Sequence, residues 1–489
     1  MTESLFAEHS GPLRILFHVT LRTMLRHFES VILTLADRGH TISIASSAHR
    51  KDVDPPARLS GHRGIEFVHA PDGRADQWSE RIVQLRVFRD YLRYLERRFD
   101  HAPKLRGRAV RKLAAVMTEE ERTHLVAFCA QCSGRLVDDD VGVIFRTGLS
   151  KKGFNNFRGL LALMEDTIPS DPSLDAFLRD QRPDILVITP LIKIGSRQPD
   201  FVKSARALGI PVSYPVFSWD NLSTKGLIHV HPDTVLVWNE RQRSEAIEMH
   251  QVAPDRIVVT GAPRFDEFFA MTPATTREEF CQVHRFDPRQ PIVSYLCSSE
   301  FVSGHEFEFV QRWLDEVRRA PALEACNLLV RPHPRRPKPW KGFKPQQSRV
   351  AVAMPQGMNG DQTLFDTAHH SAALVGLNTS AELEAGIVGR PVLTILAPES
   401  EAGQRGTLHF DYLLKEHGGF VDVAPDFETH CRQLSTAVAG DYDADAIRGF
   451  IREFLRPHGL DRPAAAITAD AIEATARGAI RTPTYAHQS

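Results

Sequence analysis

The sequence predicts an α/β protein made of two doubly wound Rossmann-like domains that face a cleft. Short apolar runs alternate with helical segments in the first part of the chain, and the alternation starts again near residue 290. Such alternation is typical of parallel sheets that are covered by helices on both faces. The length of 489 residues points the same way, because a single hydrophobic core stops growing at about 250–300 residues.

The first domain opens as strand, helix, strand. In its later part, a helix that ends at Pro or Gly leads twice into an apolar strand. The segments are LRILFHV (13–19), HFESVILTLADRGH (27–40), TISIAS (41–46), SLDAFLRDQRPDILVIT (173–189) and FVKSARALGIPVSYPVF (201–217).

The second domain repeats this order. The predicted strands are PIVSYLC (291–297), NLLVRP (327–332), RVAVAMP (349–355), AALVGL (372–377) and PVLTILA (391–397). The predicted helices are 305–320, QTLFDTAHHS (362–371) and SAELEAGIVG (380–389). We therefore expect a first domain over 1–265 and a second over 266–440. The helices of 441–489 are expected to pack back on the first domain.

A helical insertion near 81–150 interrupts the first domain. Between 81 and 112 there are 11 basic and 3 acidic residues. The helical pattern places Leu85, Phe88, Leu92, Leu95 and Phe99 on one face and Arg86, Arg89, Arg93 and Arg97 on another. One interpretation is a solvated face that pairs with acids elsewhere. The other is a surface for anionic lipid head groups or a lipid-linked phosphate acceptor.

The composition argues against several protein classes. Sixty basic against 61 acidic residues lack the basic excess that is usual in nucleic-acid binders. No window approaches the ~20 apolar residues that cross a bilayer, and the N-terminus lacks signal-peptide features. We expect a cytoplasmic protein, with peripheral contact to the inner face of the plasma membrane as an option. We expect the six cysteines to be reduced thiols. The alternative is a zinc site formed by Cys129, Cys132, Cys281 and His284.

One histidine is held at the end of an apolar strand. In NLLVRPHPRRPKP (327–339), His333 lies between two prolines, which restrict the backbone on both sides. Arg331 precedes it, and Arg335 and Arg336 follow. This charge suits a phosphate or diphosphate, with His333 as proton donor to a leaving phosphate or as general base. The alternative is a structural turn whose charges face solvent.

A helix start follows another predicted strand in GLNTSAELEAGIVGRPVLTI (376–395). Asn378, Thr379 and Ser380 occupy the N-cap region, where hydroxyls and free N–H groups can bind a phosphate. Glu384 lies one turn into the helix, where its carboxylate can accept both hydroxyls of a ribose. The alternative is a well-capped core helix.

These residues resemble the nucleotide-binding motif of the GT-B glycosyltransferase superfamily, E-A-x-x-x-G-x-P after a helix start that contains Ser. Here the motif is Glu384, Ala385, Gly389 and Pro391. RPHP together with NTSAELEA is most similar to CDP-glycerol glycerophosphotransferase-like and capsule Kdo-transferase-like proteins. The segments FSWDNLSTKG (217–226) and TLHFDYLL (407–414) resemble bacterial surface-carbohydrate biosynthesis proteins. With the junction VTGAPRFD (259–266), the resemblance covers most of the chain. UDP-GlcNAc 2-epimerases share the scaffold.

The resemblance implies a first domain that binds the acceptor and a second that binds the nucleotide donor. Arg331 and His333 would contact the donor diphosphate, Thr379 and Ser380 would bind phosphate, and Glu384 would bind ribose. Neither a metal nor a cofactor is implied, because Arg, His and a helix dipole replace the metal in such enzymes. The acidic run at 138–140 is the alternative metal-binding motif.

Further candidates would line the cleft. Ser298 and Ser299 follow the second domain's first strand as a phosphate-side loop, and His409 would contact the transferred group. On the acceptor side, Asp220 is a candidate catalytic base and Asn221 and Lys225 are candidate acceptor contacts. The remaining acceptor candidates follow the first strand and are His18, Arg22, Arg26 and His27.

The predicted function is metal-independent transfer of a sugar or polyol phosphate from a nucleotide-activated donor to a surface glycan or lipid-linked acceptor. One alternative is a UDP-sugar 2-epimerase-like isomerase, against which the long basic helix argues. The other is a non-catalytic nucleotide-sugar-binding protein.

Overall fold

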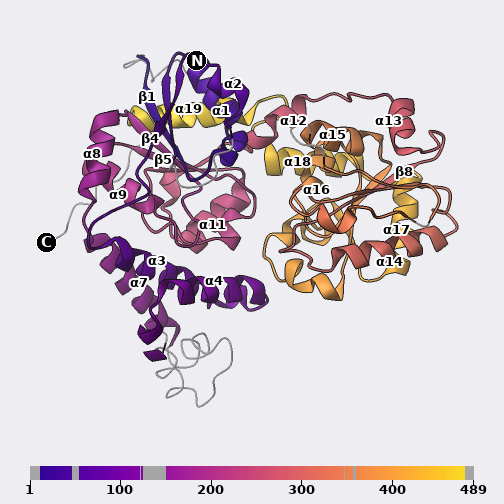
Figure 1. Cartoon of the computed structure of the whole chain (residues 1–489), viewed down its shortest axis with the longest axis horizontal. Helices are drawn as coiled ribbons and strands as arrows, with labels where there is room; N and C mark the ends of the chain where they lie inside the picture. The colour runs from indigo at the N-terminus through magenta and orange to yellow at the C-terminus, as the bar shows by residue number, and fades with distance from the viewer. Residues whose placement is uncertain are drawn as a thin grey trace, which may run out of the picture. The chain divides into compact units, whose positions relative to one another are not determined.

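The computed structural model describes residues 11–46, 54–121, 123–124, 150–345, 347–355 and 360–479. The chain forms two compact units (Figure 1). Unit 1 comprises Met1–Asp100, Leu105–Arg264 and Leu455–Ser489, and unit 2 comprises His101–Lys104 and Phe265–Phe454. Unit 1 is therefore built from both ends of the chain, and unit 2 is inserted into it.

Unit 1 contains a parallel sheet with strand order β3-β2-β1-β4-β5-β6-β7 in the part of the chain that is described. The strands are β1 (Arg14–Val19), β2 (Thr41–Ser46), β3 (Ile65–His69), β4 (Ile185–Thr189), β5 (Val212–Pro215), β6 (Thr234–Val237) and β7 (Ile257–Val259). The helices that cover it are α1 (Glu29–Asp37), α8 (Pro172–Gln181), α9 (Gln198–Ala207), α11 (Glu240–His250) and α19 (Ala464–Ala476).

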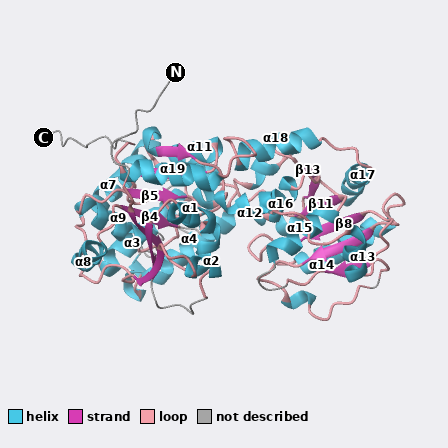
Figure 2. Ribbon diagram, turned by 90° about the horizontal axis from the view of Figure 1, so that it is seen from above, coloured by secondary structure: helices cyan, strands magenta, loops and turns pink. Residues whose placement is uncertain are grey.

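Side chains alternate between the two faces of this sheet, so each face has its own core. Ile15 and Phe17 of β1 pack with α1 and α19, whereas Leu16 packs with α8, α9 and α11 on the other face. Figure 2 shows the helices around the strands of each unit. The sheet is therefore doubly wound, as the sequence predicts.

Unit 2 contains a parallel sheet with strand order β10-β9-β8-β11-β12-β13, again counting the described residues. The strands are β8 (Ile292–Leu296), β9 (Asn327–Arg331), β10 (Val350–Val352), β11 (Ala373–Gly376), β12 (Val392–Ile395) and β13 (Val421–Ala424). The helices are α12 (Asp266–Ala270), α13 (Arg277–His284), α14 (Glu306–Arg319), α15 (Gly360–His370), α16 (Ala381–Ile387), α17 (Phe427–Val438) and α18 (Ala444–Leu455). Trp313 of α14 and Leu434 of α17 belong to its largest core.

Both sheets change winding direction at one place. In unit 2 the chain leaves β8 toward β9 on one side and returns to β11 on the other side. Ligands of such sheets bind outside the carboxyl ends of the strands at this switch point. The two Rossmann-like sheets confirm the predicted fold class, and the switch point in unit 2 lies where RPHP and NTSAELEA begin.

The insertion in unit 1 differs from its prediction. The helices α3 (Ser79–Arg93), α4 (Pro103–Val116) and α7 (Lys151–Thr167) are described, whereas residues 125–149, with Cys129, Cys132 and the run 138–140, lie outside the described residues. Arg86 and Arg93 are fully buried, while Leu85 and Phe88 are half-buried and Arg97 is exposed.

The predicted arginine stripe is therefore wrong as a solvent-exposed face at Arg86 and Arg93, whereas the predicted pairing with acids elsewhere is confirmed for Arg86. Arg86 pairs with Glu165 of α7 and Asp200 of α9, each at 2.8 Å. Arg93 donates to the carbonyls of Lys225 and Gly226. Arg89 also lies near Glu165, at 3.9 Å. These partners come from distant segments, so Arg86 and Arg93 are not available to a lipid surface; lipid contact through the rest of 81–112 stays a prediction.

The C-terminal segment divides between the units. α18 belongs to unit 2 up to Phe454. α19 packs against α1, β4, β5 and β6 of unit 1. Among the described helices, none combines the length and the apolar character that crossing a bilayer requires.

Candidate functional site

Three loops of unit 2 meet at the carboxyl edge of its sheet. β8 lies between β9 and β11, and Leu296 at its end is level with Arg331 on one side and Gly376 on the other. The loops that follow these three residues therefore leave the sheet side by side. They carry Ser298 and Ser299, His333, and Asn378 to Ser380, which the sequence predicts as a donor site.

His333 is prepared to donate a hydrogen bond. Its Nδ1 accepts the backbone N–H of Arg335 at 3.2 Å, so the neutral ring carries its proton on Nε2. Burial lowers the pKa of His333, and the charge of Arg335 lowers it further. At neutral pH the imidazole is therefore uncharged, and its free side offers an N–H to an anion.

Arg331 is half-buried, and its guanidinium is partly committed within the protein. One nitrogen, Nη2, donates to the carbonyl of Gly360 at 2.8 Å and to Oγ1 of Thr363 at 2.9 Å. These bonds hold the first turn of α15. Burial lowers the pKa of Arg331, opposed by the charges of Asp361 and Glu384. Glu384 itself is buried on α16, so the predicted ribose acceptor and this cation belong to one electrostatic group.

The loop after β8 is shaped by a residue that the sequence reasoning missed. The backbone N–H of Ser298 donates to both carboxyl oxygens of Glu306, each at 2.8 Å. Glu306 is buried, and burial raises its pKa to about 7. The first turn of a helix is a usual place for an exposed acid, so nothing in the local sequence marks this one as buried.

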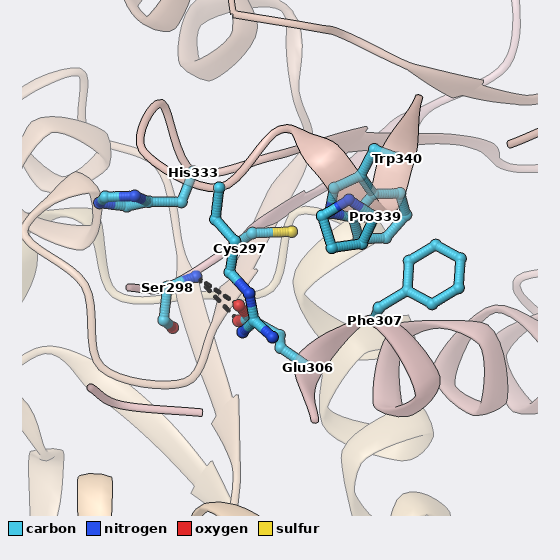
Figure 3. A pocket seen from close by; sticks show the side chains of 8 residues that line it. Cys297, Ser298, Glu306, Phe307, His333, Pro339 and Trp340 are labelled. Atoms are coloured by element: carbon cyan, nitrogen blue, oxygen red, sulfur yellow. Dashed lines mark hydrogen bonds between the residues drawn. The ribbon is translucent and has the colours of Figure 1, made fainter. Parts of the chain in front are cut away.

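A small pocket lies between the loops after β8 and β9 (Figure 3), with room for about one water molecule. Its lining residues are Cys297, Ser298, Glu306, Phe307, His333, Arg336, Pro339 and Trp340. Oγ of Ser298 is buried, and the Ser298 side chain also stabilises the charged form of Glu306. The pocket thus joins His333 and Ser298, two residues that the sequence predicts as parts of one site.

Several polar groups of the loop after β11 make hydrogen bonds within the protein. Nδ2 of Asn378 donates to the carbonyl of Gly403 at 2.8 Å and to Oγ1 of Thr407 at 3.3 Å. These bonds tie two loops together, so the Asn378 amide has a structural task at the position where the sequence suggests a phosphate contact. Oγ1 of Thr379 accepts the N–H of Ala381 at 3.4 Å. Ser380 is the N-cap and is exposed, and its side chain makes no capping bond.

A second buried carboxyl lies beneath this loop. Oε1 of Glu382 accepts the N–H of Thr379 at 3.3 Å, and a Cβ on Gly376 would lie 2.5 Å from the same oxygen. A larger residue at position 376 would therefore have to displace the buried Glu382 carboxyl. Burial raises the pKa of Glu382 to about 8. Since α16 has seven residues, its dipole is shorter than the sequence argument assumed.

Ser299 and His409 complete the predicted donor-side residues. The carbonyl of Ser299 accepts the N–H groups of Val302 and Ser303, which turns the loop after β8. His409 is buried at the start of η8 (Phe410–Leu413), between β12 and β13. The pocket lining does not include His409, so its contact with a transferred group stays a prediction.

In unit 1, His18 lies near the end of β1 and is 2% exposed. The amide oxygen of Gln198 accepts the N–H of Leu191, which turns its Nε2 toward Nδ1 of His18 at 2.9 Å. Burial lowers the pKa of His18 to about 4. The ring is therefore neutral with its proton on Nε2, and no described residue bonds that nitrogen.

The other predicted residues after β1 have separate partners. Arg22 lies over the ring of Phe67 at 5.7 Å, and His27 packs edge-on against Phe217. Arg26 is exposed on the same 3-10 helix, η1 (Arg22–His27). Their role toward an acceptor stays a prediction.

Asp220 is the centre of a local network after β5. Oδ1 accepts from Ser218 at 2.6 Å, and Oδ2 accepts from Thr224 at 3.0 Å and pairs with Lys225 at 3.2 Å. Asn221 is fully buried and donates to Asp220 at 3.4 Å. The structure brings the three predicted residues Asp220, Asn221 and Lys225 together, with the carboxylate already well supplied with donors.

Metal binding finds no support in the described residues, which contain no cluster of three His, Cys, Asp or Glu placed to hold an ion. Cys281 is a buried free thiol. His284 on the same helix packs against the rings of Phe280 and Phe286. Cys129 and Cys132 lie outside the described part of the chain.

No family model and no curated relative matches the chain. Solved structures do resemble it along most of its length. The glycosyltransferase from Rickettsia africae ESF-5 has a TM-score of 0.50 and 10% identity, over 95% of this chain and 98% of that chain. The S. aureus MnaA-UDP co-structure has a TM-score of 0.50 and 9% identity, over 94% and 96%. The UDP-GlcNAc 2-epimerase from Neisseria meningitidis bound to UDP-GlcNAc has a TM-score of 0.49 and 12% identity, over 94% and 100%. The likeness to the first two of these shows that the chain has the fold of GT-B proteins.

Proposed function

We propose that this protein is a GT-B enzyme that binds a nucleotide-activated donor at the carboxyl edge of the unit 2 sheet. It transfers a sugar or polyol phosphate to a surface glycan or a lipid-linked acceptor. The observation that carries the proposal is that three loops leave neighbouring strands side by side at the switch point. His333 and Ser298 line one pocket between two of these loops, and Ser380, at the start of α16, is assigned to the same phosphate. The likeness to a UDP co-structure supports a nucleotide as the ligand.

The leaving group is the centre of the chemistry. The bond between the transferred group and the nucleotide breaks, and its electron pair stays on a phosphate oxygen. His333 Nε2–H donates to that phosphate and Arg331 supplies a fixed positive charge. One such positioned donor is typically worth about 2.7–4 kcal/mol of barrier. Because both side chains are held by backbone contacts, little reorganisation accompanies the reaction.

Glu384 is assigned to the nucleoside. It is buried on α16 and interacts electrostatically with Arg331. A carboxylate at this position accepts hydrogen bonds from the two ribose hydroxyls. Glu384 is also the first residue of the E-A-x-x-x-G-x-P pattern, and the resemblance that this pattern carries supports the same role.

The acceptor is assigned to unit 1. An acceptor hydroxyl forms the new bond through its oxygen and loses its proton to a base, for which Asp220 is the candidate. His18 serves as a donor, since its proton is on Nε2 and its Nδ1 is occupied. RPHP and NTSAELEA, which resemble CDP-glycerol glycerophosphotransferase-like and capsule Kdo-transferase-like proteins, support a polyol phosphate or an acidic sugar as the transferred group.

The nucleotide site is tested by thermal unfolding with UDP, CDP, CMP, GDP and ADP. The variants are Glu384→Gln and the control Glu428→Gln, an exposed residue in the first turn of α17. A ligand at 100 times its Kd adds about 2.7 kcal/mol of stability. We expect one nucleotide to stabilise the wild type and the control but not Glu384→Gln. Equal stabilisation of all three proteins contradicts the role of Glu384, and none by any nucleotide contradicts the proposed function.

An incubation of the enzyme with a UDP-sugar and no acceptor, followed by NMR, distinguishes a transferase from an isomerase. An isomerase converts the sugar under these conditions, because it needs no second substrate. A transferase leaves the sugar configuration unchanged and releases the nucleotide only when an acceptor is added. Conversion without an acceptor would replace the proposed transferase with the epimerase.

A further inference from the structure

Two carboxyl groups lie beneath the loops of the proposed donor site. Glu306, at the start of α14, accepts the Ser298 N–H of the loop after β8. Glu382, at the start of α16, accepts the Thr379 N–H of the loop after β11. Both are at least 97% buried. β8 and β11 are neighbours, so the two acids support adjacent loops from below.

Among the groups described below around Glu306 and Glu382, Arg336 is the cation. Tyr295 of β8 donates to Glu306 at 3.4 Å. Arg336, after β9, stabilises the Glu306 charge from a distance, while its own guanidinium donates to the carbonyls of Ser303 and Gly304. Cys297 also faces Glu306. Glu382 is faced by Glu306 itself and by the N–H groups of Thr379 and Asn378.

The pair therefore opposes the ligand that the loops are proposed to bind. Two buried like charges repel one another, so the pair favours a state in which a proton is bound. In the ionised state, the pair also adds negative charge directly below the phosphates of a nucleotide and draws the Ser298 and Thr379 N–H groups inward. The side chain of Ser298 lies in the same pocket as Glu306 and also stabilises its charged form (Figure 3), so ionised Glu306 holds both the backbone and the side chain of this residue.

We propose that Glu306 and Glu382 are positioning residues that link nucleotide binding to the uptake of one proton. When the pair holds a proton, the loops after β8 and β11 can turn N–H groups toward a diphosphate without a buried carboxylate opposing it. When the pair is ionised, the loops are held inward and the diphosphate is repelled. This inference rests on the proposed function, and by reciprocity a bound diphosphate must in turn strengthen proton binding by the pair.

The direction of the pH dependence follows. The pKa of Glu306 is about 7 and that of Glu382 about 8. Affinity for a nucleoside diphosphate is therefore highest below pH 7 and falls above it, by up to about tenfold per pH unit for one linked proton. His333 does not titrate in this window, because its pKa is lowered from 6.5. The pKa values of Tyr295 and Cys297 are raised well above 10 and 9 by burial.

The test is calorimetric titration of the full-length protein with UDP, CDP, GDP and ADP between pH 6 and 9, in buffers of different ionisation enthalpy. The measured binding enthalpy changes with the ionisation enthalpy of the buffer, and the slope of this change gives the number of protons taken up on binding. We expect about one proton per nucleotide near pH 8 in the wild type. The variants Glu306→Gln and Glu382→Gln should each take up less than half as many protons per nucleotide as the wild type. Their affinity should also fall much less as the pH rises.

Glu308→Gln is the matched control, because Glu308 lies on the same helix but is exposed; its uptake should equal that of the wild type. Binding without proton uptake in the wild type, or equal uptake in the wild type and both variants, overturns the inference and leaves the proposed function standing. Absence of binding at every pH overturns both. The wild-type uptake needs no substitution, so a variant that fails to fold does not remove the test.

Discussion

A single buried carboxyl makes the stability of this protein depend on pH. Glu382 is 1% exposed, and burial raises its pKa from 4.5 to about 8. An unfolded chain releases this proton near pH 4.5, whereas the folded chain keeps it until about pH 8. The group therefore contributes stability that is fully present below pH 4.5 and is lost as the pH rises toward 8.

We predict that Glu382→Gln flattens this dependence. Glutamine keeps the shape and an acceptor oxygen but has no charge to bury, so the variant should gain stability relative to the wild type as the pH rises from 5 to 9. The relative gain should be on the order of a few kcal/mol, because one pKa unit corresponds to about 1.4 kcal/mol. Urea unfolding at pH 5, 7 and 9 measures it. Parallel curves for the wild type and Glu382→Gln would rule out a buried proton at this position.

Some residue positions follow from local sequence, and others do not. His333 lies at the carboxyl end of β9 because an apolar run ends there and the flanking prolines limit the backbone. Ser380 is the helix N-cap, as its sequence context indicates. The burial of Glu306 and Glu382 depends on what packs over them, and an acid in a first helical turn has the same sequence signal when it is exposed.

At the scale of elements, α3 is held in place by charge. Arg86 makes contacts of 2.8 Å with both Glu165 of α7 and Asp200 of α9. Lys203 of α9 lies 3.5 Å from the same Glu165. A helix that buries an arginine needs such partners, because an unpaired buried charge is strongly destabilising. α3, α7 and α9 therefore depend on one another.

We predict that Arg86→Met lowers the free energy of unfolding by about 3–5 kcal/mol, since it removes the shortest ion pair of two buried carboxylates, Glu165 and Asp200. Arg97→Met, at the exposed position of the same predicted stripe, should change it by less than about 0.5 kcal/mol. Chemical denaturation of both variants provides the comparison. Similar small effects would mean that Arg86 is solvated after all.

At the scale of the whole molecule, unit 1 is completed by the last helix of the described chain. Ile472 of α19 is buried in the same core as β1 and α1. α19 is separated from these elements by the whole of unit 2 in the sequence. The core of unit 1 therefore includes chain from both sides of unit 2 in the sequence.

We predict that Ile472→Ala destabilises unit 1 by about 2–5 kcal/mol, the usual cost of removing this much buried side chain. Val283→Ala is the control, because Val283 is 72% exposed on α13. Hydrogen exchange measured by mass spectrometry should show faster exchange in peptides of β1 and β4, with β8 and β9 unchanged. Equal acceleration in β8 and β9 would mean that the two units unfold as one.

The sequence alone determined that the chain forms two doubly wound sheets and where most of their strands and helices lie. It also determined that Arg331, His333 and Ser380 lie at or just after the carboxyl end of a strand. These features are local, because they depend on apolar periodicity, on proline and glycine, and on helix caps. Tertiary structure alone decided that Arg86 and Arg93 are buried, that Asn378 joins two loops, and that Glu306 and Glu382 lie beneath the candidate site. The physical reason is that burial and ion pairing depend on partners from segments far away in the chain, and a local pattern contains no information about those partners.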